Sequence, residues 1–333
     1  MSMPKKQTDL PIIIAVDDLD AAVDTYTRLL GYKLEMITPA DSPTVAVLSS
    51  KDLAVRLEKR PANASEPLIP KAKTKNPHYS IISRASDASK WVTGRAGMEY
   101  RDLIPGRLGG RVIASHIRIP NGGEVADYVH YHKVRFQMIY CVAGAIRVVY
   151  EDQGEAFWLK PGDCVLQPPE IRHRVIEAEA NSEVVEIGMP AVHETWVDHD
   201  TTLPTGRVLP DREFSGQLFV RHIAADAEWN EGEFDGFELR DTGILAATEG
   251  LARVIVTRPF YSQLPTNHPT LIHWAEFLFL FVLVGKVAIR THDGDEYELT
   301  SGDSCVIPPG LDYRVEYLND AELLEVSAGS ILG

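Results

Sequence analysis

The second half of the chain repeats the pattern of the first, and this repeat limits the folds that the sequence can adopt. Residues 161–169 are Pro-Gly-Asp-Cys-Val-Leu-Gln-Pro-Pro, and residues 301–309 are Ser-Gly-Asp-Ser-Cys-Val-Ile-Pro-Pro. Residues 97–102 are echoed in the same way by residues 236–241, and one long apolar run in each half ends at a glycine, Gly144 or Gly285. The two copies are therefore about 140 residues apart.

Each copy reads as a succession of short strands. β-Branched and aromatic residues alternate with turn residues, and helical patterns are scarce. This pattern is typical of an antiparallel, double-sheet jelly roll. We therefore predict a mainly β fold with two barrels, at residues 96–192 and 234–333, joined by a connection at residues 193–233.

The first copy carries a pattern of metal ligands. In an extended strand His130 and His132 point to the same face, so both imidazoles can enter one interior. His173, which follows the second motif, supplies a third nitrogen, and Gln137 supplies a neutral amide oxygen. This set suits Fe, Mn, Ni, Cu or Zn. The alternative is a metal-free barrel that uses its histidines for packing, but three histidines and a glutamine in this pattern favour one bound divalent transition metal.

The second copy lacks this ligand set. In the same register it has Leu271, His273, Leu278 and Tyr313, of which His273 alone is a good nitrogen donor. We predict that this barrel binds no metal. It is either purely structural or keeps a small-molecule pocket with His273, Trp274 and Tyr313 near its mouth.

A different pattern precedes the repeats. The sequence predicts a strand at residues 11–16, a helix at 21–30 that Gly31 ends, and strands at 32–37, 44–49 and 53–58. Residues 1–60 therefore read as a small α+β module with the order βαβββ. Residues 61–95, which are rich in proline and lysine, have the composition of a linker.

The motifs of the repeat resemble those of the cupin superfamily. In cupins a first motif runs from a glycine through His-x-His to Glu or Gln, and a second runs from Pro-Gly-Asp to His. The first copy matches at Gly122 or Gly123, His130, His132, Gln137 and Gly144, and then at Gly162, Pro168 and His173. The chain thus resembles a bicupin, with two double-stranded β-helix barrels of which one keeps its metal ligands.

The N-terminal segment resembles one module of the glyoxalase and vicinal-oxygen-chelate superfamily. The resemblance lies in residues 16–32, Val-Asp-Asp-Leu-Asp-Ala-Ala-Val-Asp-Thr-Tyr-Thr-Arg-Leu-Leu-Gly-Tyr. Glu58 matches one metal ligand of that family, whereas the first strand offers none, so the module is expected to be metal-free. Because such modules normally pair and one is present here, the resemblance implies a homodimer.

The resemblance to cupins also implies an activity. A metal held by these residues would chelate two oxygens of a small keto, hydroxy, carboxylate or aromatic substrate, and Fe(II) with dioxygenase chemistry is the favoured expectation. A redox-neutral isomerase or lyase, as in the cupins that isomerise uronates, is one alternative, and a non-catalytic metal or ligand sensor is another. Zn, Ni, Mn and Cu remain possible metals.

Further residues flank the predicted ligands. Tyr128 shares the strand parity of His130, so it is either a proton relay in the cavity or a core tyrosine. Arg172 and Arg174 lie beside His173, where they either bind a substrate carboxylate or form a solvated surface pair. Residues 193–200 are also rich in polar and metal-binding residue types, but we interpret them as an exposed linker.

Composition excludes several classes of partner. Lys and Arg number 33 and Asp and Glu number 48, and the net charge of −15 disfavours nucleic acid and anionic membranes. Cys141, Cys164 and Cys305 stand singly in apolar runs, which is typical of reduced core thiols. No secretion signal is evident, so we expect a cytoplasmic protein that acts on a small molecule.

Overall fold

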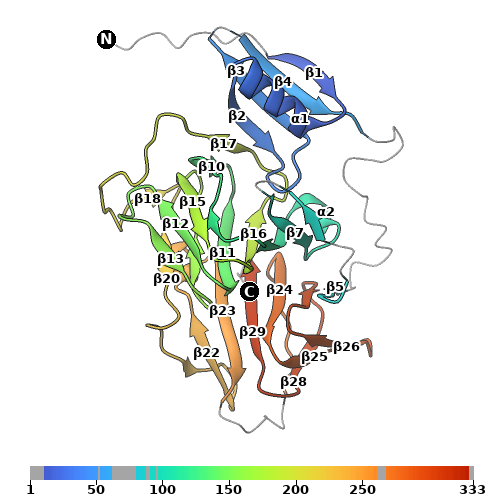
Figure 1. The fold of residues 1–333 in the computed structure, drawn as a ribbon. Coiled ribbons are helices and arrows are strands. Elements are labelled where there is room, and N and C mark those ends of the chain that lie inside the picture. The colour runs from blue at the N-terminus through green and yellow to red at the C-terminus, as the bar shows by residue number, and fades with distance from the viewer. Residues whose placement is uncertain are drawn as a thin grey trace.

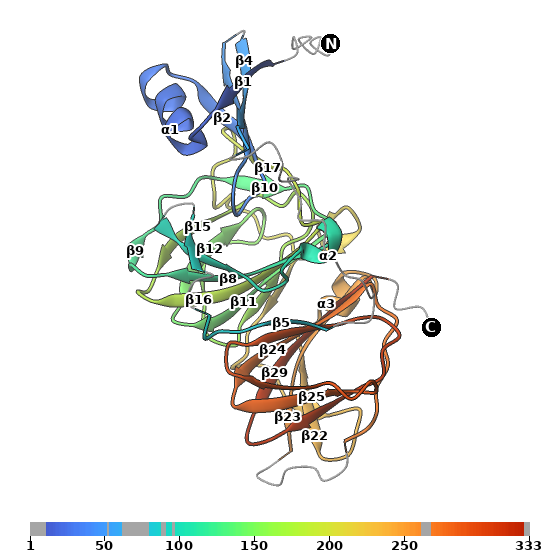
Figure 2. The same ribbon diagram turned by 90° about the vertical axis from the view of Figure 1, so that its right-hand side faces the viewer.

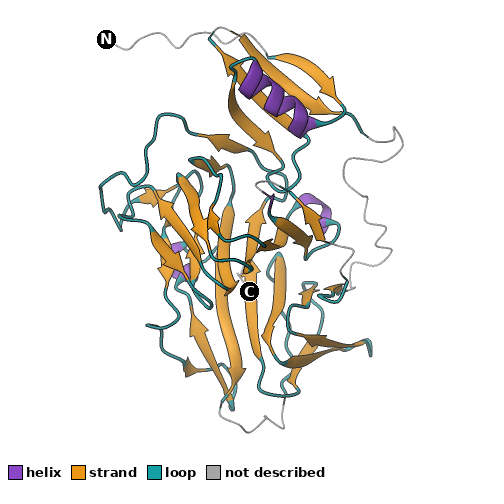
Figure 3. Ribbon diagram, viewed as in Figure 1, coloured by secondary structure: helices purple, strands orange, loops and turns teal. Residues whose placement is uncertain are grey.

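In the computed structural model the chain forms a small N-terminal module and two β-barrels (Figure 1). The structure describes residues 11–51, 53–61, 80–87, 91–94, 97–260 and 268–329. Strands predominate, and the helices are few and short (Figure 3). This arrangement confirms the predicted mainly β fold with two jelly rolls. Among the described residues, no helix is long and apolar enough to cross a membrane.

The N-terminal module has the predicted order of elements. Its strands form a sheet in the order β1-β4-β3-β2, in which β1 and β4 are parallel. Asp18 caps the helix because its side chain accepts a hydrogen bond from the Ala21 amide, and Gly31 follows the helix with a φ of +72°. The elements are β1 (Ile12–Val16), α1 (Leu19–Asp24), the π-helical turn η1 (Thr25–Leu29), β2 (Lys33–Thr38), β3 (Val45–Ser50) and β4 (Leu53–Lys59).

The first barrel is built from two facing sheets. One sheet contains, in order, β17 (Thr195–Val197), β10 (His130–His132), β15 (His173–Ala178), β12 (Ile146–Tyr150) and β13 (Phe157–Leu159), with β9 (Gly123–Glu124) beside β15. The other contains β20 (Val220–His222), β14 (Cys164–Leu166), β11 (Phe136–Ala143), β16 (Ser182–Met189), β8 (Ile113–Ile119), β7 (Glu99–Asp102) and β6 (Trp91–Thr93). The short helix α2 (Arg107–Gly110) precedes β8.

The second barrel repeats this plan. Its larger sheet has the order β21 (Asn230–Glu231), β22 (Phe237–Asp241), β23 (Ala252–Pro259), β29 (Glu322–Ala328), β24 (Phe277–Val284), β27 (Ser304–Ile307) and β5 (Ile81–Ser83). The smaller sheet contains β26 (Glu296–Thr300), β25 (Lys286–Thr291) and β28 (Tyr313–Tyr317). The helix α3 (Ile244–Ala247) precedes β23, and a two-stranded ribbon, β18 (Glu213–Phe214) and β19 (Gln217–Leu218), precedes β20.

The two barrels pack through the sheet that contains β11 and the sheet that contains β24, which lie against each other in Figure 2. Along β11, Phe136 and Met138 enter the core cluster shared by the barrels, whereas Ile139 belongs to the interior of the first barrel. Along β24, Phe279 enters the shared cluster and Leu280 the interior of the second barrel. Both faces of these strands are therefore buried, which explains why the sequence is apolar there without alternation.

The barrels also exchange strands. β5 lies before the first barrel in the chain but pairs with β27 of the second, and β20 pairs with β14 of the first. The aspartate of each Gly-Asp motif holds the exchanged strand by a hydrogen bond. Asp303 accepts a hydrogen bond from the Ala85 amide at 2.7 Å, and Asp163 accepts one from the Ala224 amide at 2.9 Å. The sequence repeat thus produces an equivalent clamp on each side of the interface.

This exchange uses part of the expected linker. Residues 62–79 lie outside the described residues, but β5 and β6 fall between residues 80 and 95 and belong to the barrel sheets. The boundaries that the sequence suggested between domains stay predictions.

The N-terminal module shares a continuous sheet with the first barrel. β2 pairs with β17, and β17 in turn pairs with β10. Thr195 is fully buried in β17, and His193 just before it is 6% exposed. The interpretation of residues 193–200 as an exposed linker is therefore wrong for His193 and for β17, whereas His199 and Asp200 are exposed. The polar composition suggested that these residues are exposed to solvent. In the structure β17 lies between β2 and β10 in the sheet, and Thr195 on it is buried.

We predict that the exchanged strand depends on Asp303. Its side chain is buried and also accepts hydrogen bonds from Arg84 at 3.1 Å and from the Thr300 amide at 3.0 Å. Asp303→Ala leaves these donors without a partner, so the free energy of unfolding should fall by about 3 kcal/mol. Chemical denaturation checks this value, and the exposed Asp293→Ala serves as the control. An equal effect of the two substitutions would contradict the clamp.

The homodimer also stays a prediction. β1 is the edge strand of the module's sheet, and Ile12 and Ile13 on it are 51% and 65% exposed. We expect light scattering to give the mass of a dimer, and Ile13→Lys to shift the equilibrium towards the monomer. A monomer at all concentrations would contradict the expected pairing.

Candidate metal centre

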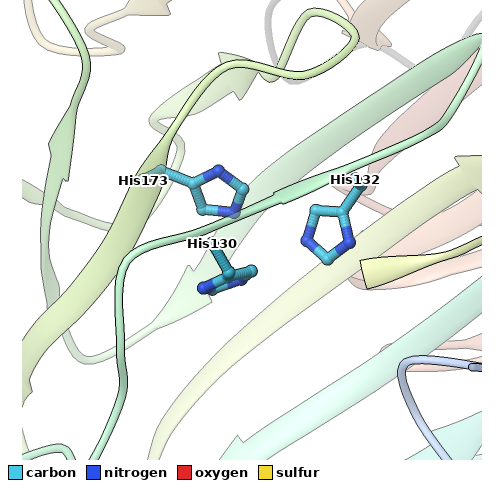
Figure 4. Close-up of side chains that lie close together, drawn as sticks. All are labelled: His130, His132 and His173. Atoms are coloured by element: carbon cyan, nitrogen blue, oxygen red, sulfur yellow. The ribbon is translucent and has the colours of Figure 1, made fainter. Parts of the chain in front are cut away.

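Three histidines converge inside the first barrel (Figure 4). His130 and His132 come from β10, and His173 begins the neighbouring strand β15, where it lies directly opposite His130 in the antiparallel register. Their exposed fractions are 2%, 6% and 6%. One ligand atom of each lies within 4.8 Å of the others. Strand pairing, rather than a local loop, therefore assembles the cluster.

Hydrogen bonds fix how each imidazole is presented. Nδ1 of His130 lies 2.8 Å from the Tyr128 carbonyl oxygen, and Nδ1 of His173 lies 2.9 Å from the Ile171 carbonyl oxygen. A carbonyl only accepts, so Nδ1 carries the proton in both rings and Nε2 carries the lone pair. Nδ1 of His132 is 2.8 Å from the hydroxyl of Thr195 on β17. Such hydrogen bonds on the second ring nitrogen are typical of histidines that bind a metal.

Gln137 lies in β11 on the opposite sheet and is 1% exposed. Its amide nitrogen donates to Oε1 of Glu186 at 2.5 Å, which leaves the amide oxygen as the donor atom that a metal would use. Its role as a ligand stays a prediction. Glu186 was not anticipated, although it shares the inward parity of Val184 on β16. It brings a carboxylate into a site for which the sequence suggested neutral ligands.

A cavity of about 90 Å³ lies beside the histidines. The histidines and Glu186 line it together with further polar residues, and apolar side chains form the rest of its wall, including Ile117, Ile139, Val148 and Val184. A space of this size favours a compact substrate.

Besides Nε of Arg174, two polar atoms of the residues that line this cavity have no hydrogen-bond partner in the described part of the chain. His193 donates from Nδ1 to the Pro190 carbonyl at 2.9 Å, so its unpaired Nε2 is an acceptor. Its ring lies 5.4 Å from that of His132, and burial lowers its pKa. The side-chain amide of Gln167 contacts the Tyr150 hydroxyl at 3.0 Å, and its other atom is unpaired. Both residues were missed because their inward orientation depends on long-range pairing.

Two tyrosines adjoin the histidines. The carbonyl of Tyr128 holds His130, and the Tyr128 ring packs edge-on against that imidazole at 5.7 Å. Tyr150 lines the cavity and stacks on His173 at 5.5 Å, and burial raises its pKa. Tyr150 is therefore better placed than Tyr128 to touch a substrate, and a proton-relay role of Tyr128 stays a prediction.

The two arginines beside His173 differ in their surroundings. Arg172 donates to Asp198 at 2.9 Å and stacks on Tyr131. Arg174 borders the cavity, but alternation along β15 directs its side chain to the face opposite His173, as for Arg172. Substrate binding by Arg172 and Arg174 stays a prediction that this geometry does not favour.

The N-terminal module closes one side of the cavity. Ala40 and Asp41, in the loop after β2, belong to its lining. Arg107 binds the Asp41 carboxylate at 2.5 Å, and the Thr38 hydroxyl donates to the His193 carbonyl at 2.8 Å. The module therefore forms part of the wall of the site, in addition to the shared sheet.

The residues present fit a divalent transition metal. Three imidazoles with their Nδ1 atoms already engaged present three Nε2 lone pairs, which suits borderline metal ions. A lone buried histidine would be explained by packing, whereas three imidazoles whose ligand atoms lie within 4.8 Å of one another could together hold one metal ion.

A family comparison agrees with this geometry. Residues 115–187 match the family model described as Cupin domain. These residues span His130, His132, Gln137 and His173. This part of the first barrel is therefore similar to the cupin family. No curated protein matches the sequence.

Solved structures resemble the larger part of the fold. Salicylate 1,2-dioxygenase from Pseudaminobacter salicylatoxidans gives a TM-score of 0.56 at 16% identity, over 79% of this chain and 86% of that chain. A variant of oxalate decarboxylase from Bacillus subtilis gives a TM-score of 0.50 at 13% identity, over 71% and 74%. At such low identities these similarities show the fold alone. The resemblance of the N-terminal module to the vicinal-oxygen-chelate superfamily stays a prediction.

We predict that Thr195 tunes the affinity of the metal centre. Thr195→Val removes the hydrogen bond that orients His132 without changing the volume of the side chain much, so metal affinity should fall about 10–100-fold. Competition with a chromogenic chelator measures this change. Thr195→Ser keeps the hydroxyl and should stay close to wild type. Equal affinities of all three proteins would show that β17 does not support the ligand.

Proposed function

We propose that the first barrel is the active site of a metal-dependent enzyme that acts on a compact, chelating substrate, with Fe(II) as the favoured metal and dioxygenase-type oxidation as the favoured reaction. The observation that carries this proposal is the buried cluster of His130, His132 and His173 beside a cavity. Iron(II) held by three neutral imidazoles would supply open coordination positions for a substrate and for O2.

The residues of this chain define what such a substrate must offer. Two of its oxygens would face the three Nε2 atoms, and a hydroxyl group would meet the acceptor Nε2 of His193. Gln167, held by Tyr150, offers a second polar atom at the same cavity. These contacts favour hydroxy ketones, hydroxy acids and catechol-like compounds over unsubstituted acids.

The protein also shapes the conditions of the reaction. Apolar walls from β8, β11 and β12 keep bulk water away from the histidines, and the loop around Asp41 covers one side. Glu186 places a carboxylate at the cavity, where it accepts the Gln137 amide and fixes the direction of that side chain. An ionised Glu186 would offset part of the charge of a bound metal, which would let the site accept substrates of low charge.

We expect oxygen consumption with a substrate of this class. The Fe(II)-loaded protein, supplied with a panel of hydroxy acids, hydroxy ketones and catechols, should consume O2 with at least one of them in an oxygen-electrode assay. His130→Ala should lose this activity, because the substitution removes a nitrogen of the metal site. His292→Ala, at an exposed position in the second barrel, should retain it.

The outcomes separate the alternatives. Anaerobic turnover of a hydroxy ketone or hydroxy acid would replace oxidation with isomerase or lyase chemistry. Ligand-induced stabilisation without product under any metal would leave a sensor. Full activity of His130→Ala would remove the metal centre itself from the proposal.

A further inference from the structure

The second barrel contains a cavity that is larger than the one beside the histidines. Its volume is about 390 Å³, against about 90 Å³ beside the histidines of the first barrel. A volume of this order lies within the range of small-molecule pockets. Leu271, Leu278 and Tyr313 occupy the places of His130, Gln137 and His173, so apolar groups replace metal ligands in its wall.

Strand alternation explains which side chains enter this cavity. On β29, Leu324 and Val326 pack into the cluster shared by the barrels, so Glu325 and Ser327 point inward. On β23, Val256 packs outward and Thr257 inward. The cavity therefore has an apolar body with a few polar groups at defined positions.

The polar end of the cavity is a chain of three residues. The Thr257 hydroxyl donates to Oε1 of Glu325 at 2.6 Å and lies 2.7 Å from the Tyr317 hydroxyl. Glu325 corresponds to Glu186 in the repeat, but no amide equivalent to Gln137 reaches it, because Leu278 stands there. Burial raises the pKa of Glu325, because the charged carboxylate is disfavoured away from water relative to the neutral carboxyl group.

Aromatic side chains and one ion pair, between Arg253 and Glu233, belong to the lining of the cavity. Trp274 is 64% exposed and Phe234 39% exposed, and both belong to the lining. Arg253 already binds Glu233 at 2.7 Å. An anionic ligand would therefore meet three acidic side chains, Glu233, Glu238 and Glu325, and an engaged arginine. A cationic ligand would be stabilised fully at Glu325 only if that buried carboxyl group were ionised.

We propose that the second barrel binds a small neutral molecule, an aromatic ring that carries one hydroxyl group, with the hydroxyl against Glu325 and the ring between Tyr313 and Phe237. A neutral carboxyl group both donates and accepts, which matches a hydroxyl group without burying a charge. The aromatic side chains supply edge-to-face contacts for the ring. This assignment uses no metal and does not depend on the reaction of the first barrel.

An isosteric series of probes tests this chemistry. Benzyl alcohol, benzylamine, benzoate and toluene share one ring and differ in charge and hydrogen bonding. Titrations of the full-length holoprotein, followed by the fluorescence of Trp274 at an excitation that the probes do not absorb, should show the tightest binding for benzyl alcohol. Trp274→Phe, which removes the reporter, identifies the part of the signal that comes from this pocket.

Variants locate the hydroxyl contact. Glu325→Leu should weaken the binding of benzyl alcohol about tenfold through loss of a hydrogen bond, whereas Glu325→Gln, which still donates and accepts, should stay close to wild type. Ser327→Phe should abolish binding by filling the cavity, and Ser327→Ala should not. Far-ultraviolet circular dichroism confirms that each variant is folded.

The same titrations can overturn the proposal. Equal affinity for toluene and benzyl alcohol would remove the role of Glu325, and tighter binding of benzylamine or benzoate would remove the neutral ligand. Absence of any Trp274 response to benzyl alcohol, or an unchanged response in folded Ser327→Phe, would show that the cavity does not bind this class.

Discussion

The pairing of β10 with β15 on one side and β17 on the other is the constraint on which the site depends. The first pairing sets His130 opposite His173, and the second places the Thr195 hydroxyl at Nδ1 of His132. Both contacts follow from backbone register, because a shift by one residue would turn the imidazoles to the outer face. β17 also pairs with β2, so the same strand carries the N-terminal module to the edge of the cavity.

The two barrels show how one scaffold supports two kinds of interior. Both keep the inward glutamate, at Glu186 and Glu325, and both keep the aspartate that fixes an exchanged strand. In the first barrel the space near the glutamate holds imidazoles and an amide. In the second it is lined by leucines and tyrosines, and a larger cavity results. The second barrel, in which leucines and a tyrosine stand at the positions of the predicted metal ligands, thus keeps an open interior rather than a filled core.

Much of the fold was predictable because patterns among residues close in the sequence determine its strands, turns and helix ends. The repeat predicted two similar barrels, and the capping Asp18 and Gly31 predicted the ends of the single helical segment in the module to within a few residues. His130 and His132 could be grouped because the i, i+2 spacing on a strand fixes a common face, and His173 was added because it follows the second motif. Long-range features were not predictable. The exchange of β5 and β20, the burial of β17 and the unpaired Nε2 of His193 all depend on which distant strand lies alongside.

The central claim is that one metal ion binds at His130, His132 and His173. Mass spectrometry of the metals in protein purified without added metal or chelator tests it most directly, with the His130→Ala/His173→Ala double variant as the comparison. We predict about one equivalent of a single transition metal per chain, with iron as the metal favoured by the proposed function, and its loss from the double variant. An equal metal content in the two proteins, or none in either after reconstitution with Fe(II), would contradict the assignment.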